Sequence, residues 1–224
     1  MPTTTTAAAV DQPSFSQALR ERSWGLHQQA EGACFMAALM DGRIDLLGYQ
    51  AMVTQHLFIY EALESVADQL RDNPIAGPFI SDRLTRVPSI RADLAYLSAQ
   101  TSSSLEPLAA TKAYTQRIRQ TADWPGGFIA HHYTRYLGDL SGGLAIGAVV
   151  ARTYGFTPGD DGVRFYRFLQ VAKPKEFKDE YRARLDSTPW DGPERDRVID
   201  EVLAAYRLNT DVFAELGRTT TPIG

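Results

Sequence analysis

Apolar side chains recur at helical spacing along almost the whole chain. The first such stretch begins after Ser14, where a capping box with Gln17 is expected, and ends at Asp41-Gly42. Further helices are predicted over residues 45–70, 81–87, 89–99, 106–122, 128–154, 173–185 and 194–216. No segment alternates apolar and polar residues convincingly enough to predict a strand. The sequence therefore predicts an all-α fold, a single-domain helical bundle.

The two ends of the chain differ from this helical body. Residues 1–13 are rich in Thr and Ala and lack the features of a secretory signal, so we expect a disordered lead. Residues 14–217 are expected to form one domain, with Gly217 ending the last helix and 218–224 forming a flexible tail. The longest apolar run is far shorter than the roughly 20 residues of a membrane-spanning helix. We therefore expect a cytoplasmic protein without a membrane segment.

Composition restricts the chemistry to a few side chains. The 224 residues carry 23 basic and 27 acidic side chains, a net charge of −4 that gives no support to nucleic-acid binding. Cys34 is the sole cysteine, which excludes a disulfide framework and a cysteine-ligated zinc or iron–sulfur site. Any site that needs imidazole must be built from the four histidines, His27, His56, His131 and His132.

His27 has the most suggestive neighbours of the four. On a helix it shares one stripe with Arg20, Trp24 and Glu31, because these positions advance by three or four residues. One ring nitrogen of His27 could face a metal while Glu31 orients the ring. A half-buried, hydrogen-bonded structural histidine also explains this pair, and is the commoner case.

The other three histidines show no comparable pattern. His131 and His132 are adjacent, so on a helix their side chains point about 100° apart and cannot serve one ligand. A structural role is expected for both. His56 has no partners at ligand spacing.

The segment Tyr-Leu-Gly-Asp-Leu-Ser-Gly-Gly at 136–143 departs from the rules for a helix interior. Its three glycines would cost roughly 3 kcal/mol relative to alanine if the segment is one helix. Gly138 and Gly142 are four residues apart and share a face. A helix end at Gly142-Gly143 or a close helix–helix contact would explain the glycines. The functional alternative is a flat ligand that lies against the bare backbone of a bent helix.

A cluster of cations follows further along the chain. Three of the four lysines fall within residues 173–178, and Lys178 and Arg182 project together at i, i+4. Such a cluster is most often a solvated helix face. The alternative is an anion site for carboxylates or phosphates, to which Tyr133 could add a hydroxyl.

Together these segments resemble the heme oxygenase family. Residues 131–143 are similar to the family's distal-helix signature, and residues 26–31, followed by Phe35-Met36, are similar to its proximal-helix motif. Residues 177–182 and 209–216 also match in order and spacing, so the resemblance runs from about residue 14 to residue 217. It implies a bundle in which heme lies between a proximal helix and a kinked distal helix.

The resemblance implies a role for each of the central candidates. His27 would be the axial ligand of the heme iron, and Glu31 would hydrogen-bond its other ring nitrogen. Gly138 and Gly142 would form the bend of the distal helix over the heme. Asp139 would hold a water network on that side.

Further residues complete the implied site. Arg135, with Tyr60 and Tyr114, would extend the water network. The heme propionates would be held by Arg20, Tyr133, Lys178 and Arg182. The remaining implied heme contacts are Ser141, Gly143, Tyr206 and Asn209. Leu144 stands where relatives commonly have glutamine, and little effect is expected from it.

The implied reaction is oxidative cleavage of heme b, which is both substrate and cofactor. Dioxygen and an external electron donor would convert it to biliverdin, expected as the α isomer, with carbon monoxide and ferrous iron. A separate redox partner, a ferredoxin or a flavoprotein reductase, is expected, because the chain has no flavin or nicotinamide motif. Lys173, Lys175 and Arg182 could form its docking face. A monomer is expected, and its biological use would be iron acquisition from heme or supply of biliverdin.

Two rival classes stay open. One is a non-catalytic heme carrier that binds through His27. The other is a non-heme relative of the same fold, such as a thiaminase-like hydrolase that uses Cys34, or a di-iron oxidase.

Overall fold

The computed structural model describes residues 13–101, 105–157 and 161–220, and within these ranges it contains helices and no strand. The first half of the chain forms α1 (Phe15–Glu31), α2 (Cys34–Met40), α3 (Leu46–Gln69), α4 (Val87–Ser98) and α5 (Ala109–Arg119). The second half forms α6 (Pro125–His132), the π-helical segment η3 (Tyr133–Leu137), α7 (Gly138–Tyr154), α8 (Pro174–Ser187) and α9 (Gly192–Thr219). Short 3-10 turns are η1 (Gly77–Phe79), η2 (Asp82–Leu84) and η4 (Arg164–Tyr166). The predicted all-α bundle is confirmed.

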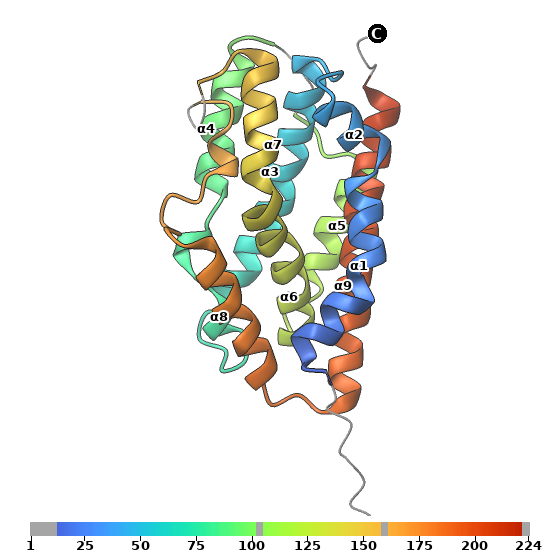
Figure 1. Ribbon diagram of the computed structural model, residues 1–224, viewed down its shortest axis with the longest axis vertical. Coiled ribbons are helices and arrows are strands. Elements are labelled where there is room, and N and C mark those ends of the chain that lie inside the picture. Colours follow the sequence, from blue (N-terminus) through green and yellow to red (C-terminus); the bar gives the residue numbers. More distant parts are fainter. Residues whose placement is uncertain (1–12, 102–104, 158–160, 221–224) are drawn as a thin grey trace, which may run out of the picture.

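The long helices run roughly along one direction and pack in pairs. α1 lies against α9 along one edge of the molecule, and α3 packs against α4 and α5 (Figure 1). α9 buries a stripe of residues spaced three, four or seven apart: Val198, Val202, Ala205, Val212 and Leu216. Burying one such side chain contributes roughly 1.5–3 kcal/mol, so this stripe fixes α9 against α1, α5 and α6.

Helix starts follow local signals in the sequence. Ser14 Oγ accepts a hydrogen bond from the Gln17 backbone N–H, and the Gln17 side chain accepts one from the Ser14 backbone at 3.0 Å. This is the predicted capping box, and such a cap contributes about 1 kcal/mol. Asp45 caps α3 through the Gly48 N–H at 2.7 Å, and Asp191 caps α9 in the same way.

Some predicted helix boundaries are wrong. The first predicted helix is divided, because α1 ends at Glu31 and the Gly32 N–H closes it onto the Gln28 carbonyl at 2.9 Å. The segment 124–127 opens α6 instead of closing the helix before it. Pro125 takes the first helical turn, where its missing N–H leaves no hydrogen bond unmade. A Cβ on Gly126 would lie 2.7 Å from a Val198 methyl, so glycine lets α6 approach α9 closely.

The C-terminal helix also runs further than predicted. Gly217 lies inside α9, which continues to Thr219, so the expected tail from residue 218 is helical at its start. Residues 221–224, and residues 1–12 of the expected lead, lie outside the described residues. Within the described ranges no helix is both long enough and apolar enough to cross a membrane.

The segment 125–154 forms one uninterrupted helical path with an irregular turn inside it. η3 has the wider π-helical turn, and such turns commonly bend a helix. Gly138 directly follows η3, and α7 continues regularly through Gly142 and Gly143. The irregular turn therefore precedes the two glycines, whereas the sequence placed the bend at Gly138 and Gly142. The alternative of a helix end at Gly142-Gly143 is wrong.

Candidate functional site

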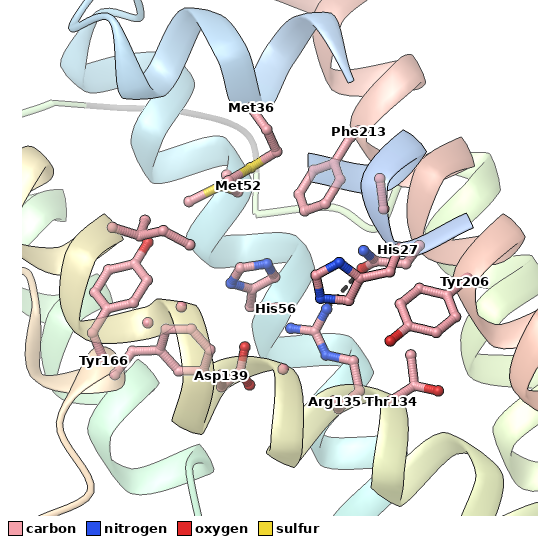
Figure 2. A pocket seen from close by; sticks show the side chains of 17 residues that line it. His27, Met36, Met52, His56, Thr134, Arg135, Asp139, Tyr166, Tyr206 and Phe213 are labelled. Atoms are coloured by element: carbon pink, nitrogen blue, oxygen red, sulfur yellow. Dashed lines mark hydrogen bonds between the residues drawn. The ribbon is translucent and has the colours of Figure 1, made fainter. Parts of the chain in front are cut away.

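A cavity opens between α1, α3, α7 and α9, and its walls come from segments far apart in the sequence (Figure 2). Its lining residues are His27, Ala30, Met36, Met52, His56, Thr134, Arg135, Gly138, Asp139, Gly142, Gly143, Ile146, Phe165, Tyr166, Tyr206, Asn209 and Phe213. A second hollow shares His27, Gly138 and Tyr206 with this cavity. The two hollows are therefore adjoining parts of one cleft.

The second hollow is lined by several cations. Its other lining residues are Arg20, Ser23, Trp24, Tyr133, Leu137, Ser141, Lys178 and Arg182. Apart from Tyr60 and Tyr114, the residues implied for the heme site whose side chains are described all line one of the two hollows. The side chain of Glu31 lies outside the described part of the structure.

The face of α7 at the cleft is bare backbone. A Cβ added to Gly138 or Gly142 would meet no atom within 4 Å among the described residues. Gly147, one turn further along, is different, because its added Cβ would lie 2.9 Å from Tyr166 Cβ. Close packing therefore explains Gly147, whereas Gly138 and Gly142 face open space in the cavity. The first two glycines of the motif leave room for something flat to approach the backbone.

His27 lies where the two hollows meet. Its ring stacks on Trp24 with centroids 5.4 Å apart and meets the edge of Tyr206 at 5.8 Å. These two aromatic contacts limit rotation of the imidazole. The ring is half-buried, and it is the histidine shared by both parts of the cleft.

Asp139 sits on α7 beside the two glycines and is held from α3. The Tyr60 hydroxyl donates a hydrogen bond to Asp139 Oδ2. Burial raises the pKa of the Asp139 carboxyl well above its usual value, because the surrounding protein disfavours the charged form. The carboxyl is half-buried, and Asp139 lines the cavity. A protonated carboxyl there can both donate and accept hydrogen bonds.

Arg135 projects from η3 towards the same cavity. Its Nη1 donates to Asn209 Oδ1 at 2.7 Å, and its guanidinium lies over the Tyr60 ring at 5.1 Å from the centroid. Burial lowers the pKa of Arg135, although a guanidinium stays charged in a protein. Tyr60 and Tyr114 are buried and line neither hollow. Tyr60 therefore reaches the site through its contacts with Asp139 and Arg135.

The cationic hollow joins α8 to α7 and α1. Lys178 Nζ donates to Ser141 Oγ at 2.9 Å. Partial burial lowers the pKa of Lys178, and the neighbouring Arg182 lowers it further. Burial raises the pKa of Tyr133, while Arg182 and Arg20 oppose that rise. Like charges gathered around one hollow make it a favourable place for an anion.

The two outer lysines of the basic cluster do not line this hollow. Lys173 Nζ lies 2.9 Å from Glu176, and Lys175 Nζ lies 3.1 Å from Asp179. Arg182, which does line it, also pairs with Asp179 at 3.0 Å. Exposed pairs of this kind contribute little to stability, but they partly neutralise the basic rim predicted from the sequence.

The remaining histidines divide into two kinds. His131 is buried, with Nε2 2.8 Å from Glu201, and His132 Nδ1 shares a 3.0 Å hydrogen bond with the Tyr181 hydroxyl. Both hold the core together, as expected. His56 instead lines the cavity, although the sequence showed no partner for it. The sequence feature that could have identified His56 is its position one helical turn before Tyr60 on α3.

The chain is similar to proteins of one family over most of its length. The family model described as heme oxygenase matches residues 13–215. Heme oxygenase 1 of Bos taurus is 32% identical over 204 residues, covering 90% of this chain and 71% of the bovine protein. Heme oxygenase 1 of Nostoc sp. is 33% identical over 192 residues, covering 85% of this chain and 80% of that protein.

Solved structures give the same result. Heme oxygenase-1 of Synechocystis sp. in complex with heme superposes with a TM-score of 0.85 at 31% identity, covering 92% of this chain and 94% of that one. Heme oxygenase of Leptospira interrogans superposes with a TM-score of 0.84 at 30% identity, covering 91% of this chain and 100% of that one. Similarity in sequence and in fold thus points to a single family.

Proposed function

Since the chain belongs to the heme oxygenase family, it is an oxidoreductase of heme degradation that opens heme to biliverdin, and we propose that the cleft beside α1 and α7 is its active site. The observation that carries this proposal is the bare face of α7. Gly138 and Gly142 leave open space in the same cavity that His27 lines. The bare face would accept a flat macrocycle, and His27 would supply an imidazole for its iron.

His27 is the proposed axial ligand of the heme iron. A neutral imidazole is a suitable ligand, and the contacts with Trp24 and Tyr206 hold the ring in one orientation. Glu31 is proposed to accept a hydrogen bond from the other ring nitrogen, which raises the basicity of an iron-bound histidine. The catalytic domain then covers residues 14–217, since the cleft draws on helices from α1 to α9.

The cationic hollow is the proposed site of the heme propionates. Arg20, Lys178 and Arg182 supply charge for two carboxylates, and Arg can hold a carboxylate through two parallel hydrogen bonds. The Tyr133 hydroxyl and Ser141 add neutral donors. By holding the two carboxylates, these side chains would decide which edge of the heme faces the apolar part of the cavity. The α isomer of biliverdin is the proposed product.

Asp139 is proposed to hold and orient a water molecule in the cavity, and that water, rather than the carboxyl itself, would supply the proton. Burial raises the pKa of the carboxyl well above its usual value, and the Tyr60 hydroxyl fixes the position of Oδ2. Arg135 extends this network through Asn209. The Gly138, Gly142 and Gly143 backbone and the Tyr206 ring complete the proposed walls around the substrate.

Dioxygen and electrons have to come from outside the chain. Heme supplies the iron at which dioxygen is activated, and a ferredoxin or a flavoprotein reductase is the proposed electron donor. Lys173, Lys175 and Arg182 remain the proposed docking face, with a modest contribution because each has a carboxylate partner. A monomer that releases iron from heme, or supplies biliverdin, is the proposed biological unit.

A hemin titration followed by reduction in air tests the proposal. The wild-type protein is expected to bind hemin and, with ascorbate or a reductase, to form the α isomer of biliverdin. His27→Ala should keep its helical content and lose turnover, and added imidazole should restore part of that turnover. Full turnover in His27→Ala without imidazole contradicts the axial role.

A second pair of variants tests the distal and propionate roles separately. Asp139→Ala should still bind hemin but divert electrons to hydrogen peroxide, so that less biliverdin forms per electron consumed. Lys178→Ala combined with Arg182→Ala should give a mixture of bilin isomers. An unchanged yield in the first variant, or a single isomer in the second, contradicts the corresponding role.

A further inference from the structure

His56 is the least explained polar side chain of the cavity. It projects from α3 into the space lined by Asp139 and Arg135 (Figure 2), and it is only 6% exposed. Neither ring nitrogen meets a hydrogen-bond partner within the described ranges. Its nearest aromatic neighbours are Phe165 and Phe213, with ring centroids 5.1 and 6.5 Å away.

A buried imidazole without partners destabilises a fold unless something else in the cavity meets it. Buried polar groups in proteins are almost always hydrogen-bonded, and water fills the role where the site is polar enough. The apolar neighbours of His56 would accommodate a leucine of similar size. Packing alone therefore gives no reason for an imidazole at this position.

The polar groups around His56 show what it can contribute. Burial and the nearby Arg135 cation lower the pKa of His56 well below 6.5, so the ring is neutral, with one donor and one acceptor nitrogen. Arg135 can only donate, and its Nε has no partner among the described residues. Asp139 lines the same cavity, and its Oδ2 accepts a hydrogen bond from the Tyr60 hydroxyl. Asn209 Oδ1 accepts from Arg135, and the Thr134 hydroxyl donates to the Ala130 carbonyl.

We propose that His56 is a positioning residue for heme cleavage, whose ring accepts a hydrogen bond through cavity water from the network of Asp139 and Arg135. The ring thereby holds that network on the side of the cavity where Gly138 and Gly142 leave space. This inference rests on the proposed role of Asp139. It adds a residue from α3 that neither the motifs nor the histidine spacing identified.

Three substitutions separate positioning from packing. His56→Leu removes both ring nitrogens at similar size, and His56→Gln keeps one acceptor and one donor. His132→Leu is the matched control, since His132 is equally buried but lines neither hollow and has Tyr181 as its partner. If His56→Leu does not fold, His56→Met replaces it, because methionine fills irregular gaps.

The expected results differ between apoprotein and complex. In the apoprotein, His56→Leu should raise the melting temperature by about 2–4 °C, whereas His132→Leu should lower it. In the hemin complex, His56→Leu should form biliverdin with about fivefold lower yield per electron consumed, the scale of one lost hydrogen bond. Hemin affinity should stay within about twofold of the wild type, since His56 contacts the network and not the iron. His56→Gln should recover most of the yield, and His132→Leu should leave it unchanged.

Three results overturn the inference. The first is a biliverdin yield in His56→Leu that equals the yield of an active wild-type protein. The second is a yield in His56→Gln as low as in His56→Leu. The third is a hemin complex with the low-spin spectrum of two histidine ligands that His56→Leu abolishes, because this places the ring on the iron. If the wild-type protein itself forms no biliverdin, or if Asp139→Ala leaves the yield unchanged, the failure lies instead in the proposed function.

Discussion

Replacing the two glycines of the bare α7 face by alanine should stabilise the protein and impair it at the same time. Gly138 and Gly142 both have helical surroundings, and an added methyl would meet nothing within 4 Å among the described residues. Alanine is favoured over glycine in a helix interior by about 0.8–1 kcal/mol. The double variant should therefore gain about 2 kcal/mol in the apoprotein, or roughly 4–8 °C in melting temperature for a domain of this size.

The same methyl groups should harm the reaction. They project into the cavity that His27, Asp139 and Arg135 line, so they occupy the space assigned to the substrate face. A displacement of about 1 Å in a reacting group can reduce a rate by about a hundredfold. We expect biliverdin formation to fall between tenfold and a hundredfold in the double variant, on the same scale.

Two other glycines serve as controls. Gly25 on α1 is exposed, lines neither hollow, and its added Cβ also meets nothing within 4 Å of it among the described residues. Gly25→Ala should raise the melting temperature and leave biliverdin formation unchanged. Gly147→Ala should lower the melting temperature, because its Cβ would lie 2.9 Å from Tyr166 Cβ.

Circular dichroism of the apoprotein during heating measures the stability, and chromatography of the bilins formed after hemin, reductant and air measures the reaction. A lower melting temperature in the Gly138/Gly142 double variant would show that the space beside α7 is filled. Wild-type biliverdin formation in that variant would show that the bare face is not where heme lies.

Three further predictions concern stability and charge. Glu201→Gln removes the carboxylate that Arg117 and a buried histidine share. Urea titrations should show a free energy of unfolding lower by about 2 kcal/mol. This loss is smaller than for a fully buried pair, because Arg117 is partly exposed. Burial lowers the pKa of His132 to about 3, so the folded state binds fewer protons there than the unfolded state. The free energy of unfolding should therefore fall as pH drops from about 6.5 towards 3, by up to about 1.4 kcal/mol per pH unit. His132→Gln should reduce that slope in urea titrations at several pH values. Lys178→Ala should weaken hemin binding about tenfold, as measured by fluorescence quenching. Lys112→Ala on α5 should not weaken it, because Lys112 lines neither hollow. Equal affinities in both variants would contradict the propionate clamp.

Local signals in the sequence account for much of the fold. The capping box at Ser14 and the cap at Asp45 act within one turn, so their hydrogen bonds could be predicted from residue types three apart. The start of α6 at Pro125 was missed because Trp-Pro-Gly-Gly reads locally as a turn. Gly126 is explained by the close approach of α9, which lies about seventy residues further along the chain, whereas Gly127 lies against the Trp124 ring of the same segment.

The site was predictable where its residues form a local motif and not where packing alone assembles it. Gly138 and Asp139 stand in one unusual segment, which breaks the rules of helix propensity and so attracts notice. His56 breaks no rule of sequence, since a histidine on an apolar helix is usually a satisfied core residue. Its role depends on which face of α3 meets the cavity, and that is set by the packing of α3 against α4, α5 and α9.

The cleft collects features that each lower stability, and this is an argument about function in its own right. Gly138 and Gly142 have low helix propensity. His56 is buried without a hydrogen-bond partner among the described residues. Arg135 and Asp139 are ionisable groups whose burial disfavours the charged form. Glu201, an ionisable group buried elsewhere in the described core, is paired with Arg117. Residues that lower the stability of a protein are retained where the surrounding structure tolerates them and the activity needs them. Because alanine or leucine would stabilise these positions, the glycines and His56 are best explained by the substrate and water that the cleft has to hold.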